Sequence, residues 1–318
     1  MPPSISSRLQ EVTLDLVWSL WVELGVSGWT RRHTDWAIDP EPLILFTAAL
    51  GDADQRLRDE STDWCIRYHR YVSVARLRNL LRDTWSDVGD GFGEYAATVN
   101  AHARAGWPQA TVPRPYRPTG RSKLEDFRRP ALLVLRLRAL FGVTARADLV
   151  GTLVAQPDRD FATADLAEAV GFTKRSVQNE LEALRLAGLV ESVLVRNQRR
   201  NRLARRNEVL AFLAPCPSHF PRWNPFLRIL FAGGEVLLRT ETLAPMVQAV
   251  EAKRTLRSLE GDLRRAGIAP PRDVQGAAFC DAFATWVLDL AEHLANAPPP
   301  VDPMVARPRR QFNWDDGT

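Results

Sequence analysis

The sequence predicts a mainly α-helical protein: a helical N-terminal domain, a central unit that ends in a small β-hairpin, and a helical C-terminal domain. Apolar residues recur at helical spacing on both sides of the centre. One stretch, "LVESVLV", reads instead as a strand, and an arginine-rich turn follows it. Proline-rich stretches separate the parts. We therefore expect a helical N-terminal domain at 1–106, a linker at 107–130 and the central unit at 131–213. A helical C-terminal domain at 214–297 and a flexible tail at 298–318 follow.

The N-terminal domain is expected to open with a helix at 9–25, whose apolar residues are spread around its circumference. Shorter helices are predicted at 43–50, 55–68 and 73–82. The last of them begins at Ser73, a residue type that favours the N-cap position. It carries Arg76, Arg78 and Arg82, whose stems are suited to lie along apolar surface while the charges reach water. We interpret this region as a helical packing domain.

The linker contains five prolines and therefore cannot form a continuous helix. Its basic residues flank Tyr116 in an extended segment, and such an arm can follow the minor groove of DNA. The same segment can equally lie as a strap across its own helical domain, with Tyr116 buried. Both interpretations stay open for the basic residues Arg114, Arg117, Arg121 and Lys123.

The central unit is predicted to contain a helix at 144–155, followed by a pair of helices joined by a tight turn. Thr163 is a plausible N-cap for the first helix of the pair, which runs to Val170. Gly171 then stands where a left-handed residue would end that helix. This spacing predicts a short helix, a glycine turn and a second helix.

The second helix of the pair is expected to start after an N-cap at Thr173 and to run to about Ala187, before Gly188. Val177, Leu181 and Leu184 recur at i, i+4 and i+7 and form its buried stripe. The N-terminal half carries residue types that hydrogen-bond base edges or phosphates. The candidate DNA-reading residues are Thr173, Lys174, Arg175, Ser176, Gln178 and Asn179.

A hairpin follows, with a strand at 189–195, a turn at 196–202 and a return that can finish as a helix. Its turn and return hold six arginines within eleven residues, and no acid lies between the first and the last of them. So many like charges require a compensating anion, and a phosphate backbone would supply it. The candidate phosphate-binding residues are Arg196, Arg199, Arg200, Arg202, Arg205 and Arg206.

With these elements in this order, residues 144–213 resemble the winged helix-turn-helix domains of bacterial transcriptional regulators of the MarR and ArsR type. The resemblance implies binding to double-stranded DNA, commonly as a homodimer, with one helix in the major groove and the hairpin against phosphates. It identifies no operator or effector. The metal-sensing cysteine motif of such regulators is absent, so metal sensing is not implied. Residues 41–82 are also compatible with a second, degenerate helix-turn-helix, although we favour the packing domain.

The C-terminal domain is expected to form helices at 226–238, 243–266 and 273–294. Apolar stripes run along the second and third of these helices, from Leu256 to Ile268 and from Phe279 to Leu294. We expect these stripes to pair two copies of the chain. Two heads related by a two-fold axis would then reach half-sites about 34 Å apart, one helical turn of DNA.

The composition favours one nucleic-acid face on an ordinary protein, because the formal net charge of the 318 residues is only +4. The three cysteines stand far apart and suggest neither a disulfide framework nor a metal site, which fits the reducing cytoplasm. No apolar run approaches the length of a membrane span. We expect no cofactor, no metal and no membrane association.

Catalytic patterns are weak. "GDGFGE" at 89–94 lacks the strand and the lysine of a phosphate loop. Asp35, Asp39 and Glu41, beside His33, form the best acid cluster, but the Asp-Pro and Glu-Pro pairs read more naturally as a helix entry. Cys216 and His219 lack a second ligand pair. We therefore expect that the protein is not an enzyme.

Two functions remain. The first is a sequence-specific regulator of transcription that acts as a repressor. The second is an antitoxin-like interaction protein that binds an enzyme partner and autoregulates its operon, since some abortive-infection antitoxins join a winged helix to a partner-binding domain. The segment "SLWVELGVSGW" and the sequence after it also resemble an uncharacterised group of bacterial proteins, which implies no functional residue.

Overall fold

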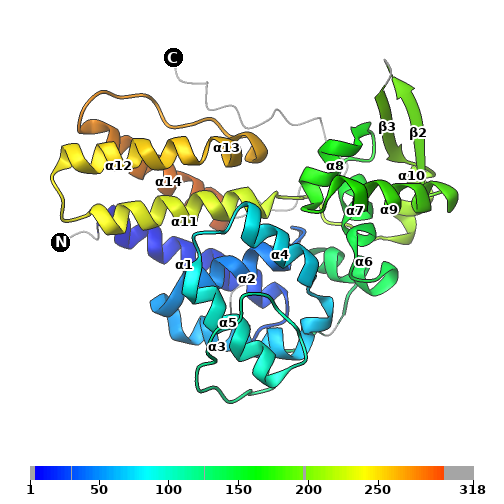
Figure 1. Ribbon diagram of the computed structural model, residues 1–318, viewed down its shortest axis with the longest axis horizontal. Coiled ribbons are helices and arrows are strands. Elements are labelled where there is room, and N and C mark those ends of the chain that lie inside the picture. Colours follow the sequence, from blue (N-terminus) through cyan, green and yellow to red (C-terminus); the bar gives the residue numbers. More distant parts are fainter. Residues whose placement is uncertain (1–3, 30, 125, 196–197, 297–318) are drawn as a thin grey trace.

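The computed structural model describes residues 4–29, 31–124, 126–195 and 198–296, so the tail expected at 298–318 lies outside the described residues. These segments are mainly helical, with one small antiparallel sheet (Figure 1). The helices are α1 (Ile5–Glu23), α2 (Pro40–Ala49), α3 (Gln55–Tyr68), α4 (Val74–Asp83), α5 (Gly89–His102), α6 (Leu133–Phe141), α7 (Ala145–Ala155), α8 (Thr163–Val170), α9 (Lys174–Leu186), α10 (Arg206–Phe212), α11 (Trp223–Thr240), α12 (Pro245–Ser258), α13 (Glu260–Ala266) and α14 (Ala278–Ala295). The strands are β1 (Phe161–Ala162), β2 (Val190–Val195) and β3 (Gln198–Leu203).

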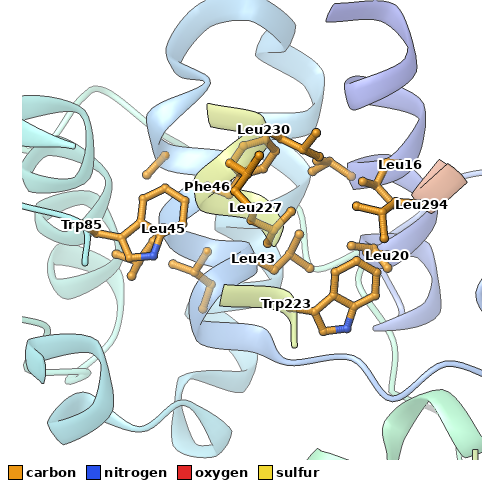
Figure 2. Close-up of a cluster of buried hydrophobic side chains, with 14 of the residues drawn as sticks. Leu16, Leu20, Leu43, Leu45, Phe46, Trp85, Trp223, Leu227, Leu230 and Leu294 are labelled. Carbon is orange, nitrogen blue, oxygen red and sulfur yellow. The ribbon is translucent and has the colours of Figure 1, made fainter. Parts of the chain in front are cut away.

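The N-terminal and C-terminal regions share one apolar core, which we call the body (α1–α5 and α11–α14). The C-terminal half of helix α1 is buried on most sides and therefore needs neighbours on most sides. Its Leu16 and Leu20 pack with α2 and α11 and with Leu294 at the end of α14 (Figure 2). We expected two separate domains at 1–106 and 214–297, but the sequence boundaries between them cut through this common core.

The C-terminal stripes expected to pair two copies are buried inside the body instead. Leu259 and Leu263 lie in its core, as do Phe279, Phe283 and Leu290 of α14. The expected helix at 243–266 is two helices, because Leu259 ends α12 and is the residue before α13. The buried residues of these stripes are therefore not available to a second copy, and Leu256 and Ile268 are partly covered by the same core.

The linker lies as a strap against the body. The buried carboxylate of Asp63 accepts backbone N–H bonds from Thr119 and Gly120, both at 2.7 Å, and a longer one from Ser122. The hydroxyl of Tyr116 donates to the carbonyl oxygen of Asp59 at 2.9 Å. Of the two arrangements that the sequence left open, the structure has the strap, because Asp63 of α3 accepts hydrogen bonds from the backbone N–H groups of the linker.

The central unit, which we call the head (α6–α10 with β1–β3), has a second, separate core. Helices α7, α8 and α9 pack together, and β3 lies between β1 and β2 in the sheet. Asn201 of β3 is paired with Phe161 of β1 and with Ser192 of β2. Helix α6 joins the two parts, since Leu135 belongs to the core of the body while Leu133 and Leu137 belong to that of the head.

Candidate nucleic-acid interface

Helix α9 turns one face to the core of the head and the opposite face to solvent. The hydroxyl of Thr173 caps the helix by accepting the N–H of Ser176 at 3.2 Å. Val177, Leu181 and Leu184 are buried, as their spacing predicted. The exposed side chains opposite them form no hydrogen bond or ion pair within the described segments, so they are available to a ligand: Lys174, Arg175, Gln178 and Asn179. Ser176 is half-buried beside them.

Helix α8 starts differently from the expectation. Its first residue is Thr163 and its N-cap is Ala162, which makes no side-chain capping bond. The Thr163 hydroxyl instead lies 3.4 Å from the side-chain nitrogen of Asn201 in β3. The assignment of Thr163 as an N-cap is therefore wrong, because its strand neighbours Phe161 and Ala162 pair with β3 and the hydroxyl bonds across the sheet. Gly171 ends α8 in the left-handed region, at φ 71°, as predicted.

The body holds the turn between α8 and α9. Arg76 of α4 donates from Nε to the carbonyl oxygen of Val170 at 2.9 Å. Asn79, one turn further along α4, donates to the carbonyl oxygen of Gly171 at 3.0 Å. These bonds satisfy carbonyls that a helix end leaves without a partner. Helix α4 is thus occupied by the head, which removes the basis for a degenerate helix-turn-helix at 41–82.

The hairpin is longer than expected. The segment 196–202 was predicted to be a turn, but β2 and β3 remain paired as far as Val195 and Gln198. Most of the arginines therefore lie on a strand or directly after it. Arg196, also a candidate, lies outside the described residues.

The arginines of the hairpin have acidic neighbours that lie elsewhere in the sequence. Arg202 forms an ion pair with Glu191 at 2.6 Å, and Arg200 lies 3.8 Å from Asp165 of α8. Arg205 lies 3.8 Å from Glu208, and Arg206 pairs with Asp158. All of these pairs are solvent-accessible and contribute little to stability. The compensating anion expected from the sequence is thus partly supplied by the protein itself.

Arg199 is an exposed residue of β3 and is paired with Leu194 of β2. The hydrogen bond from Arg185 and, to a lesser degree, the charge of Arg199 lower the pKa of Glu182. Arg199 is therefore close enough to α9 for its charge to act on Glu182.

The basic residues of the strap do not form a free arm. Arg114 is largely buried and forms an ion pair with Asp59 at 2.6 Å. Arg121 lies 3.9 Å from Glu60, and the backbone N–H of Lys123 donates to Gly25. Arg117 is exposed. The strap therefore presents scattered charges on the body, away from the hairpin.

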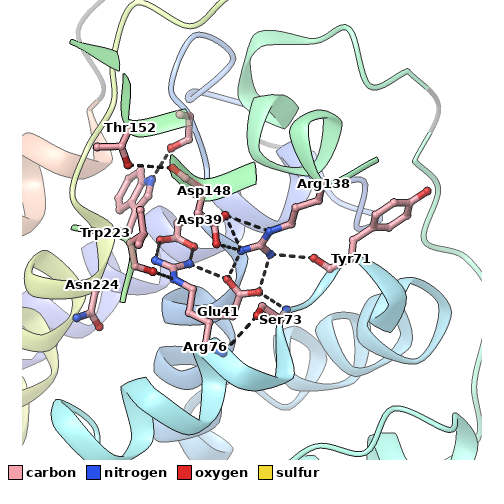
Figure 3. Close-up of polar contacts among 12 residues, drawn as sticks. Asp39, Glu41, Tyr71, Ser73, Arg76, Arg138, Asp148, Thr152, Trp223 and Asn224 are labelled. Carbon is pink, nitrogen blue, oxygen red and sulfur yellow. Dashed lines mark hydrogen bonds and ion pairs between the residues drawn. The ribbon is translucent and has the colours of Figure 1, made fainter. Parts of the chain in front are cut away.

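A buried ionic cluster joins the body to the head (Figure 3). Glu41 of α2 accepts from Arg138 of α6 at 2.6 and 2.8 Å and from Arg76 at 2.7 Å. Arg138 also contacts Asp148 of α7 at 3.1 Å, and Arg76 holds Asp39 with two bonds. Burial alone would raise the pKa of Glu41, but Arg138 and Arg76 lower it to about 2. Burial raises the pKa of Asp148.

The sequence did not identify this cluster, because α2 and α4 of the body are far in the chain from α6 and α7, which supply Arg138 and Asp148. Asp39 and Glu41 were noted only as a weak catalytic cluster with Asp35 and His33. In the structure, arginines pair with both Asp39 and Glu41. The backbone N–H of Ser218 donates to Asp35. The His33 ring lies between the Ser19 hydroxyl and the Leu294 carbonyl, and contacts both. Within the described ranges, no three histidine, cysteine or acidic side chains are grouped to hold a metal ion.

A cavity of about 400 Å³ opens beside the ionic cluster, between α7 and α8 of the head and the start of α11. Its apolar wall includes Leu80, Leu133 and Trp223. Four acidic side chains and four arginines line it, so its charge favours neither an anion nor a cation: Asp39, Asp148, Asp165, Glu168, Arg76, Arg159, Arg222 and Arg265.

Comparison with known proteins places the chain in no group: no family model, no curated protein and no solved structure matches it. No helix in the described part of the chain has both the length and the apolar character to cross a membrane.

Proposed function

We propose that this protein binds double-stranded DNA at specific sequences through its head and regulates transcription as a repressor. The observation that carries the proposal is the exposed face of α9, where Lys174, Arg175, Gln178 and Asn179 have no partner among the described side chains. Arginine pairs with guanine edges and asparagine or glutamine with adenine edges in the major groove. Burial of Val177 and Leu181 fixes which way this face points.

The order of elements supports the same function. The head has three helices, a short strand and a hairpin whose second strand lies centrally in the sheet, and this order supports the proposal of a winged helix-turn-helix. In that arrangement the last helix enters the major groove and the hairpin contacts phosphates. Arg199 of β3 extends the positive field of α9 toward the backbone of bound DNA. Repression follows in this proposal from occupation of a promoter by a bulky body attached to the head.

The test is selection of binding sites from random duplexes with the full chain and with Arg175→Ala. The variant is expected to lose about 1–3 kcal/mol at one position of the selected site and to relax the preference there. Arg185→Ala is the matched control, because it removes the same charge from the exposed far end of α9, where Arg185 pairs with Glu182. An Arg175→Ala protein with unchanged site preference and affinity would refute base reading by α9.

Repression itself is tested with a reporter placed behind the selected site. Expression of the full chain should lower reporter output, and Arg175→Ala should restore it, while Arg185→Ala should behave like the unaltered chain. A rise in output on expression of the unaltered chain would instead identify an activator.

A further inference from the structure

Five large apolar side chains stand exposed on one end of the body, at the end of α11 and on α12. Their exposed fractions are 62% for Leu238, 44% for Leu243, 56% for Met246, 45% for Val247 and 57% for Val250. Exposed apolar residues gathered in this way mark interaction sites more often than scattered ones do. We call these five residues the α12 patch.

The patch exists because α12 buries only its narrow side. Ala249 and Ala252 are the buried residues of this helix, and α12 packs through them against α11 and α14. On α12 itself, Met246, Val247 and Val250 share the outward face, which continues into Arg254 and Arg257, both exposed, and exposed Leu243 lies just before the helix. The outward face is thus apolar in its first half and basic in its second half, and exposed Glu241 lies before the apolar half.

We propose that a second copy of this chain covers the α12 patch, with the two α12 helices antiparallel and the two-fold axis near Met246 and Val247. Such a pairing is isologous, because the same patch serves both partners. It sets Leu243 of one copy against Val250 of the other, and it brings the turn with Arg254 toward the end that carries Glu241. A parallel pairing would set Arg254 and Arg257 against their own copies, which like charges oppose.

The direction of α12 has a consequence for DNA. In Figure 1, α12 starts at the end of the molecule away from the head and runs toward the head. Antiparallel pairing therefore directs the two heads to opposite ends of the dimer. This step rests on the proposed function: the half-sites then lie farther apart than the single helical turn of about 34 Å expected from the sequence, or on two separate DNA segments.

The first experiment measures the number of copies in solution by light scattering and sedimentation of the full chain over a range of concentrations. The unaltered chain is expected to form dimers. The double variant Met246→Glu, Val250→Glu should be folded by circular dichroism, and its dimer dissociation constant should rise by at least about thirtyfold, the loss typical of an interface hot spot. Leu194→Glu, at an exposed apolar residue of β2, is the matched control and should leave the dimer intact.

The second experiment tests the position of the axis by disulfide cross-linking. Cys65 and Cys280 are buried, so Cys216→Ser gives a background without an accessible thiol among the native cysteines. On that background Val247→Cys, close to the axis, should form linked dimers under mild oxidation, and Leu194→Cys should not. A monomeric unaltered chain, an unchanged dimer in the double variant, or equal cross-linking at both cysteines overturns the pairing.

The two proposals fail separately. A dimer that links through Val247→Cys but selects no DNA sequence retains the pairing and refutes the proposed function. A monomer that selects sequences in an Arg175-dependent way supports the proposed function and refutes the pairing. If both hold, the selected sites should contain either two half-sites more than one turn apart or a single half-site bound on each of two DNA segments, and one-turn spacing would contradict the antiparallel arrangement.

Discussion

The body and the head are stabilised in different ways. None of the ten tryptophans lies between residues 131 and 213. In the body, Trp21, Trp64, Trp85 and Trp223 are fully buried, whereas the core of the head consists mainly of leucine, valine and alanine. Large aromatic side chains bury more area per residue than aliphatic ones. The buried aromatic side chains are therefore concentrated in the body.

The two parts nevertheless meet through charge rather than through apolar contact alone. The largest loss of stability should come from Arg138→Ala. This change leaves the buried carboxylate of Asp148 without its arginine and removes one of the two arginines that pair with Glu41. Loss of one partner of a buried ion pair costs about 3–5 kcal/mol. Urea unfolding should show this loss, while Arg128→Ala at an exposed pair should change stability little. Equal losses in the two variants would mean that the cluster does not join the parts.

Acid should weaken the body through His33. Burial, opposed by the hydrogen bond to Leu294, lowers the pKa of His33 from 6.5 to about 4. Between these two pKa values His33 is protonated in the unfolded chain but neutral in the folded chain, so the free energy of unfolding falls as pH decreases. The loss amounts to about 3 kcal/mol across the window. Unfolding at a series of pH values should give a flatter dependence for His33→Gln, and parallel curves for the two proteins would contradict this origin.

The hairpin of the head should act on affinity and leave the stability of the body alone. Replacing Arg199 and Arg200 by alanine is expected to weaken binding to all sequences alike. It should reduce the slope of log affinity against log salt by about one to two units. Titrations at several salt concentrations measure this slope, and the change should lie near the lower value because Arg200 already has Asp165 nearby. An unaltered slope would exclude phosphate contacts at this place.

The smallest expected effect is a difference in stability between alanine variants of two threonines of the head. Thr173→Ala removes a helix cap and should cost about 1 kcal/mol of stability. Thr163→Ala removes a hydroxyl that caps no helix, and the change should remain within about 0.5 kcal/mol. Paired unfolding curves decide between them. A larger loss for Thr163→Ala would show that its contact with Asn201 matters more than the cap.

Local signals in the sequence predicted much of the secondary structure. Gly171, Thr173 and the stripe from Val177 to Leu184 act within one or two helical turns, and the structure confirms each of them. The candidate residues on α9 were found in this way and, apart from half-buried Ser176, are exposed, although their role in DNA binding stays a prediction.

Features that depend on distant residues were missed. No local pattern tells that Asp165 and Asp158 lie beside hairpin arginines, or that Glu41 meets Arg138 across 97 positions. The C-terminal stripe was recognised, but the neighbour that covers it was not. The core shared by α1 and α14 joins the two ends of the described chain, and periodicity alone names no partner for a stripe.

The bonds from α4 to the end of α8 mean that the head is not an independent module that can be moved to another protein unchanged. A transplant cut at residues 131–213 would leave the carbonyls of Val170 and Gly171 to water and would separate Arg138 from Glu41. A chimaera that keeps the head in register would need to carry α2 and α4 with it. The unit that could be exchanged between proteins is therefore larger than the unit that would touch DNA.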